Sequence, residues 1–212
     1  MEALTLPTLD WHAESAPLPP ETVTGDRGVV LHSGECVFAI AIDALGHGPE
    51  AAAIADEALR FLIQDREAEP PRLEAVFERC HAHLRGTRGI AMCLADIDPV
   101  AGNMAWLSVG NIQAVHIQHD AGGMPRYETL IMRGGVVGDR LPELRTSYAS
   151  LKSGDMIVFA SDGINFGWNT EYRPGMTPRA LATALIERHC HGRDDAMAMA
   201  LHYVPFATGG SE

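Results

Sequence analysis

The sequence has little of several features that would place it in particular classes of protein. It contains no run of about 18 uninterrupted apolar residues, so no transmembrane helix is expected. Its first twenty residues lack a basic start followed by an apolar stretch, so no secretory signal is expected. Basic residues are few: 16 Lys and Arg stand against 28 Asp and Glu. The resulting formal net charge of -12 disfavours binding to nucleic acid or to an anionic membrane.

Cysteines are also few, and the four in the chain lie far apart in the sequence. They show neither the paired spacing of a zinc site nor a disulfide framework. Free thiols in a reducing compartment are the direct interpretation, so we expect a cytoplasmic protein. The run His189-Cys190-His191 does not change this expectation, because adjacent residues at a helix end point in different directions.

The chain is long enough and apolar enough to form a proper core. It has 212 residues, of which 46% are hydrophobic, so burial can offset the entropy lost on ordering. We find no internal repeat and no linker that would divide it, and the proline-rich segment Ala16–Glu21 is typical of a loop. A single domain over residues 1–212 is therefore expected.

The order of apolar patterns along the chain predicts an α+β fold. Strand-like segments come first, two helices follow, and a long run of strands precedes a third helix and a last strand. Connections between successive strands are too short for parallel crossovers, so the sheets should be mainly antiparallel. The expected strands are Leu9–Ser15, Asp26–Ser33, Cys36–Asp43, Ile90–Ile97, Met104–Val109, Gln113–Gln118, Tyr127–Met132, Leu144–Ser150, Asp155–Ala160 and Ala196–Val204, and the expected helices are Glu50–Arg66, Pro71–Arg85 and Thr177–Cys190.

Four aspartates stand beside turns or at the ends of these strands: Asp26, Asp43, Asp162 and Asp194. A carboxylate at the end of a rigid strand is well placed for a preorganised metal site. Two divalent ions about 4 Å apart can neutralise a phosphomonoester and activate a water. Magnesium and manganese prefer such oxygen ligands. Taken singly, Gly-Asp and Ser-Asp-Gly are ordinary turn sequences, so the ordered set carries the prediction.

The segments around these aspartates, taken in order, resemble the metal-dependent protein phosphatase (PPM) family. Within it, they are most similar to the branch of the stage II sporulation protein E phosphatase domain and the stressosome phosphatases. The resemblance runs from about Trp11 to Val204. It is carried by Gly25-Asp26, Ile42-Asp43-Ala44-Leu45-Gly46-His47-Gly48-Pro49-Glu50-Ala51-Ala52, Gly110-Asn111, Gly134-Gly135-Val136-Val137-Gly138, Asp155-Met156-Ile157-Val158-Phe159-Ala160-Ser161-Asp162-Gly163-Ile164 and Arg193-Asp194-Asp195-Ala196.

This resemblance implies a four-layer α/β/β/α sandwich and the activity of a serine/threonine protein phosphatase. Asp43 would contact two Mn²⁺ or Mg²⁺ ions, and Asp162 and Asp194 would complete the first site. The carbonyl of Ala44 would serve the second ion, with Asp26 contributing directly or through water. A water activated by the two ions would attack the phosphoserine or phosphothreonine, and Asp43, Asp162 and Asp194 would be the catalytic residues. The implied substrates are phosphorylated stressosome scaffold proteins, whose dephosphorylation resets a stress signal.

Two departures from the family pattern stand in the sequence. Ala44 occupies the position of a usual glycine, and alanine can serve there if its φ is negative. Met197 occupies the position of a frequent threonine. Arg27 and Arg133 are both candidates for contacting the substrate phosphate. Three other functions stay open: a catalytically silent module that binds a phosphoprotein, a structural domain stabilised by metal, and a phosphatase acting on an anti-sigma-factor antagonist.

Overall fold

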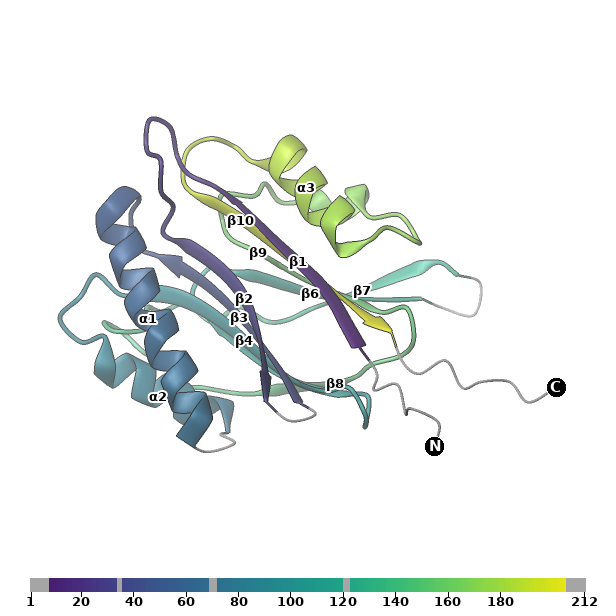
Figure 1. The fold of residues 1–212 in the computed structure, drawn as a ribbon, viewed down its shortest axis with the longest axis horizontal. Coiled ribbons are helices and arrows are strands. Elements are labelled where there is room, and N and C mark those ends of the chain that lie inside the picture. Colours follow the sequence, from purple (N-terminus) through teal and green to yellow (C-terminus); the bar gives the residue numbers. More distant parts are fainter. Residues whose placement is uncertain (1–7, 34–35, 69–71, 120–122, 205–212) are drawn as a thin grey trace, which may run out of the picture.

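Two five-stranded sheets pack face to face, and helices cover the two outer faces (Figure 1). The computed structural model describes residues 8–33, 36–68, 72–119 and 123–204. Helices α1 (Gly48–Ala68) and α2 (Leu73–His83) lie on one outer face, and α3 (Pro178–His189) lies on the other. This arrangement confirms the expected α+β sandwich of four layers.

All strand pairings in both sheets are antiparallel, as the short connections predict. The first sheet has the order β2 (Asp26–Ser33), β3 (Cys36–Ala44), β4 (Ile90–Asp98), β5 (Asn103–Val109) and β8 (Ser147–Ser150). The second has the order β1 (Thr8–Ala16), β10 (Ala196–Val204), β9 (Met156–Ala160), β6 (Gln113–His119) and β7 (Pro125–Thr129). The turn expected at residues 34–35 lies outside the described residues.

The central strand β3 is buried on both faces, which explains its unbroken apolar sequence. Its residues Ile40 and Ile42 face the helices and pack in one cluster with Ala55 of α1. The alternate residues Ala39 and Ala41 belong to the core between the two sheets. Because side chains alternate along a strand, one apolar segment can serve both layers.

A few element boundaries differ from those expected. Helix α2 begins at Leu73 and ends at His83, whereas Pro71–Arg85 was expected, and Pro71 lies outside the described residues. Strand β7 ends at Thr129 rather than at Met132. A short 3-10 helix, η1 (Trp168–Glu171), was not expected. Helix α3 begins as predicted, because Thr177 caps it by accepting a hydrogen bond from the Ala180 amide at 3.2 Å. None of the helices within the described ranges is long and apolar enough to span a membrane.

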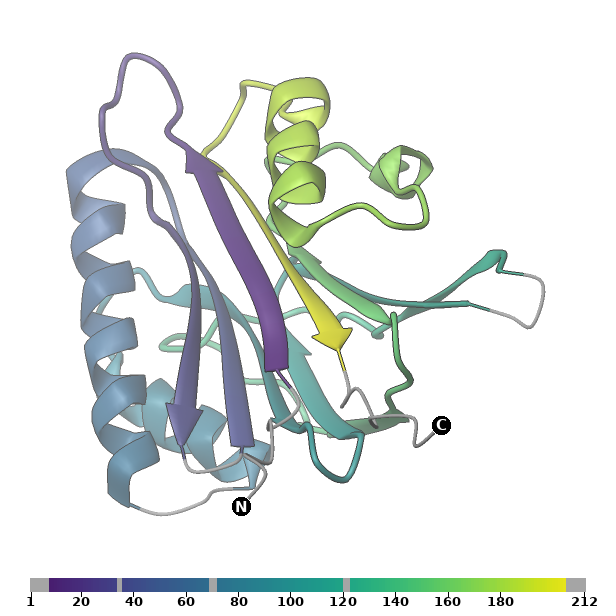
Figure 2. The ribbon, with the colours of Figure 1, turned by 45° about the vertical axis from the view of Figure 1, so that its right-hand side comes forward.

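One end of the sandwich collects strand ends from both sheets. There β3 ends and leads into α1, β9 ends, and β10 begins. The loop between β1 and β2 crosses the same end (Figure 2). Segments far apart in the sequence therefore meet at this end.

Candidate metal centre

Asp26 and Asp43 lie directly opposite each other on the neighbouring strands β2 and β3 of the first sheet. Asp26 is the first residue of β2, and the antiparallel register pairs it with Asp43 near the end of β3. Asp162 follows β9 by two residues, and Asp194 precedes β10 by two. Since β9 and β10 are neighbours in the second sheet, these four carboxylates come from both layers.

The charges that act on Asp43 indicate which other carboxylates lie near it. Burial raises the pKa of Asp43 well above its usual value, and the carboxylates of four other aspartates raise it further. These aspartates are Asp26, Asp162, Asp194 and Asp195. All of the aspartates predicted from the sequence are therefore brought together, and the structure adds Asp195 to them.

The pKa values of Asp26, which is buried, and of Asp194, which is half-buried, are raised as well. Burial raises the pKa of Asp26 to about 7, with further contributions from Asp195, Asp194 and Asp162, while a hydrogen bond from the Ser161 hydroxyl opposes the shift. The pKa of Asp194 is also raised, chiefly by burial; the backbone N–H of Asp195 and the His47 side chain oppose that rise. Among the described groups that act on the pKa values of Asp26, Asp43 and Asp194, only His47 can carry a positive charge.

This donor set fits hard divalent cations. Crowded, partly buried carboxylates with little compensating positive charge gain most from an ion that neutralises them. In the part of the chain that the structure describes, no three carboxylate, thiol or imidazole groups already converge as ligands of one ion. Two of the carboxylates also accept hydrogen bonds: the Asn111 amide donates to Asp162 at 2.6 Å, and the Ser161 hydroxyl donates to Asp26 at 2.7 Å.

The turn after β3 places backbone close to the cluster. Gly46 and Gly48 have φ values of 91° and 75°, which favour glycine. A Cβ at Gly48 would lie 2.8 Å from the Glu21 carboxyl carbon, and one at Gly46 would lie 2.9 Å from an Arg88 nitrogen. His47, in the same turn, has its Nδ1 at 3.6 Å from Glu21. Arg88 therefore lies over this turn, although no motif in the sequence indicated it.

The two departures from the family pattern have clear structural settings. No non-glycine residue within the described ranges has a positive φ, so Ala44 meets the condition for replacing glycine. Met197 is buried in the core between the sheets, and its backbone N–H donates to the Ser161 hydroxyl at 2.8 Å. Ser161 in turn donates to Asp26, so the methionine position helps to orient this carboxylate through its backbone.

The two arginines named from the sequence play different parts. The Arg27 guanidinium donates to the carbonyls of Thr24 and Asp26 and to the Asp56 carboxylate of α1. The Arg27 side chain therefore links β2 to helix α1. Arg133 is partly exposed, and its guanidinium makes no hydrogen bond or ion pair with any residue that the structure describes. Its carbonyl accepts from the Gly110 amide at 2.9 Å, next to Asn111.

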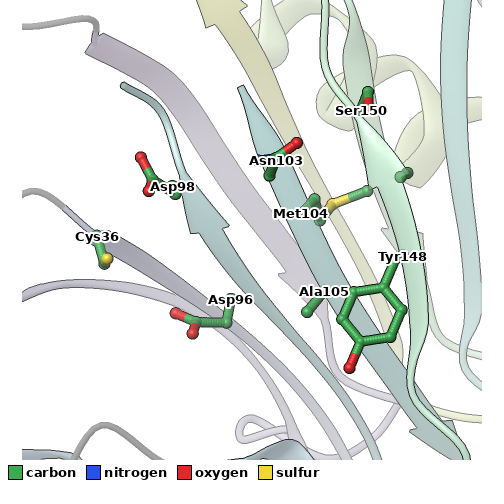
Figure 3. A pocket seen from close by; sticks show the side chains of 9 residues that line it. Cys36, Asp96, Asp98, Asn103, Met104, Ala105, Tyr148 and Ser150 are labelled. Atoms are coloured by element: carbon green, nitrogen blue, oxygen red, sulfur yellow. The ribbon is translucent and has the colours of Figure 1, made fainter. Parts of the chain in front are cut away.

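A cavity of about 410 Å³ is separate from this cluster. Side chains from β3, β4, β5 and β8 line it, among them Cys36, Asp98 and Tyr148 (Figure 3). Cys36 begins β3 and Asp98 ends β4, so the cavity lies at the opposite end of the first sheet from Asp43. It contains none of the predicted site residues.

Known proteins share this architecture and this sequence pattern. A family model described as Stage II sporulation protein E (SpoIIE) matches residues 33–202, a stretch that includes Asp43, Asp162 and Asp194 and begins after Asp26. A chain solved in a study called "The bacterial stressosome: a modular system that has been adapted to control secondary messenger signaling" is 27% identical. The match covers 92% of this chain and 100% of that one, with a TM-score of 0.79.

Two further structures agree in fold. RsbX in complex with magnesium is 17% identical with a TM-score of 0.78, and the match covers 92% of this chain and 95% of RsbX. The serine/threonine phosphatase PstP/Ppp of Mycobacterium tuberculosis is 13% identical with a TM-score of 0.72, and the match covers 92% and 99% of the two chains. The chain belongs to the SpoIIE family, a branch of the metal-dependent serine/threonine protein phosphatases, as its sequence predicts.

Proposed function

We propose that the aspartate cluster holds two Mn²⁺ or Mg²⁺ ions and that the chain uses them to dephosphorylate stressosome scaffold proteins. The metal centre is supported by the pairing of Asp26 with Asp43 in the first sheet and by the four other aspartates whose charges raise the pKa of Asp43. When bound, two such ions neutralise the substrate phosphate and lower the pKa of the attacking water.

In this proposal each protein group has a defined part. Asp43, central in the cluster, contacts both ions. Asp162 and Asp194 complete the first site, and the Ala44 carbonyl serves the second. Asp26 contributes directly or through water. The Asn111 amide and the Ser161 hydroxyl, which donate to Asp162 and Asp26, orient these two carboxylates.

The stressosome substrate is supported by the resemblance of the chain to proteins of that system. The match to the chain from the stressosome study spans the whole of that chain at 27% identity, and RsbX shares the fold. We also propose that residues 1–212 act as one domain in a reducing cytoplasm. The four free cysteines are consistent with that compartment.

Hydrolysis by metal-stripped protein tests the proposal. The substrates are a generic aryl phosphate and serine-phosphorylated stressosome scaffold protein, each with and without added manganese. We expect turnover of both that depends on the metal and is lost in Asp43→Asn. Turnover of the aryl phosphate alone would retain the metal chemistry and reject the stressosome substrate. Turnover that persists without metal would reject the metal centre.

A further inference from the structure

Asp195, next to the predicted ligand Asp194, makes contacts that the roles above do not use. It is 3% exposed, and both oxygens of its carboxylate accept backbone hydrogen bonds. Its Oδ1 accepts from the Leu18 amide at 2.7 Å, and its Oδ2 accepts from the Gly25 amide at 2.6 Å. Both donors belong to the loop between β1 and β2, which crosses the metal end of the sandwich (Figure 2).

Gly25 connects Asp195 to two residues that are predicted to bind the metal, Asp26 and Ala44. It directly precedes Asp26 in the chain, and its carbonyl accepts from the Ala44 amide at 3.3 Å. A Cβ at Gly25 would lie 2.8 Å from the Ala51 Cβ of α1, so the loop backbone packs tightly against the helix. The position of Gly25 therefore affects both Asp26 and the peptide group that joins Asp43 to Ala44.

Asp195 also packs against the turn that carries Asp162. A Cβ at Gly163 would lie 2.0 Å from the Asp195 carbonyl oxygen. The same residue thus contacts the loop of the first sheet through its side chain and the turn after β9 through its backbone. It lies where the two halves of the metal centre meet: Asp26 and Asp43 from the first sheet, and Asp162 and Asp194 from the second.

We propose that Asp195 is a positioning residue that keeps the two halves of the metal centre in register. Its carboxylate offers acceptors to both amides, and hydrogen bonds to an ionised acceptor are stronger than neutral ones. An asparagine has one acceptor oxygen and would direct an NH₂ donor at one of these amides. The inference rests on the proposed metal-dependent function and adds to it a residue that does not itself bind the metal.

If Asp195 had only a structural role, replacing it would lower stability without changing metal binding. Asp155 provides a control for this alternative. Asp155 is 2% exposed and accepts from the Lys152 amide at 2.8 Å, but it precedes β9 at the end of the sheet remote from the cluster. Asp155 also pairs with the buried His116 ring at 2.8 Å, so Asp155→Asn, like Asp195→Asn, perturbs a buried carboxylate and controls for a general loss of stability. Only Asp195→Asn should alter metal binding.

The test is calorimetric titration of metal-stripped protein with manganese, well below the lowest unfolding midpoint of the variants. We expect Asp195→Asn and Asp195→Ser to weaken manganese binding about 10- to 100-fold, the range seen when groups that orient metal ligands are lost. Asp155→Asn should bind as the wild type does. Excess manganese should restore kcat in Asp195→Asn, because the ligands themselves remain.

Three outcomes would overturn the inference or its basis. Wild-type affinity in both Asp195 variants would show that the contact is not needed for metal binding. Failure of both variants to fold would make Asp195 a folding residue instead. A wild-type protein that binds no manganese would reject the proposed function itself, and this result is distinct from the first two.

Discussion

Asp26 and Asp43 occupy directly opposed positions at the ends of β2 and β3, so two carboxylates face each other at the edge of a buried sheet. Like charges placed this way oppose folding unless protons or cations neutralise them. Burial raises the pKa of both residues, and the Asp26 carboxylate raises the pKa of Asp43 further.

The first prediction concerns Asp43→Asn. Loss of the central carboxylate should lower phosphatase activity on the order of 100-fold or more, since losing a group that merely orients a ligand already costs about 10- to 100-fold. The fold should persist, because asparagine has nearly the same shape and removes a like charge. Turnover with manganese and the circular dichroism spectrum are the measurements. Near-normal turnover in a folded variant would reject Asp43 as the shared ligand.

The second prediction concerns the pH dependence of stability without metal. The pKa of Asp26 rises from 3.8 to about 7 on folding, so the folded state holds a proton that the unfolded state releases at lower pH. Its stabilising contribution is complete below pH 3.8 and is lost as the pH rises through about 7. Each pH unit between these values should lower the free energy of unfolding by up to about 1.4 kcal/mol for this group.

Denaturant unfolding of metal-stripped protein across this pH range gives the measurement. Asp26→Asn should flatten the slope, since it removes the titrating group. Saturating magnesium should flatten it as well, because the ion takes the place of the proton. A slope unchanged in Asp26→Asn would show that another group causes it.

The third prediction concerns Gly163→Ala. The new methyl group would meet the Asp195 carbonyl at 2.0 Å, so the backbone must shift. Overpacking of this kind costs about 1–3 kcal/mol and occasionally more, and each kcal/mol lowers the melting temperature of a domain this size by about 2–4 °C. Gly134→Ala is the control, because nothing lies within 4 Å of a Cβ there. Equal melting temperatures for the two variants would contradict the close packing.

The fourth prediction separates the two arginines. Arg27→Gln should lower the melting temperature, since the guanidinium ties Thr24 and Asp26 to Asp56. Arg133→Gln should leave stability unchanged and raise KM for a phosphopeptide about tenfold or more, as expected for loss of a charged hydrogen bond of about 1.5–3 kcal/mol. The reverse pattern, with KM altered by Arg27→Gln alone, would assign the phosphate contact to Arg27.

The local parts of the site could be read from the sequence. Two strands joined across Gly34-Glu35 pair Ser33 with Cys36, and counting back along both strands pairs Asp26 with Asp43. The apolar run ending at Asp43 and the glycine turn after it likewise indicated a strand followed by a helix. These features depend on neighbouring residues, so local pattern was sufficient.

Contacts between distant segments could not be predicted in this way. Asp195 meets Gly25 across 170 positions, and nothing in the local pattern distinguishes its role from that of Asp194. The hydrogen bond from Arg27 to Asp56 of α1 and the position of Arg88 over the glycine turn also depend on how the layers pack. Helix η1 was missed because only four residues form it, too few to show a helical period.

The most direct test of the central claim is a crystal structure of the protein soaked in manganese, with anomalous scattering used to locate the ions. We expect two manganese peaks that share Asp43, one of them also contacting Asp162 and Asp194 and the other the Ala44 carbonyl. Asp26 should lie beside the second peak, directly or through a water. Manganese sites elsewhere in the molecule, with none at Asp43, would contradict this claim.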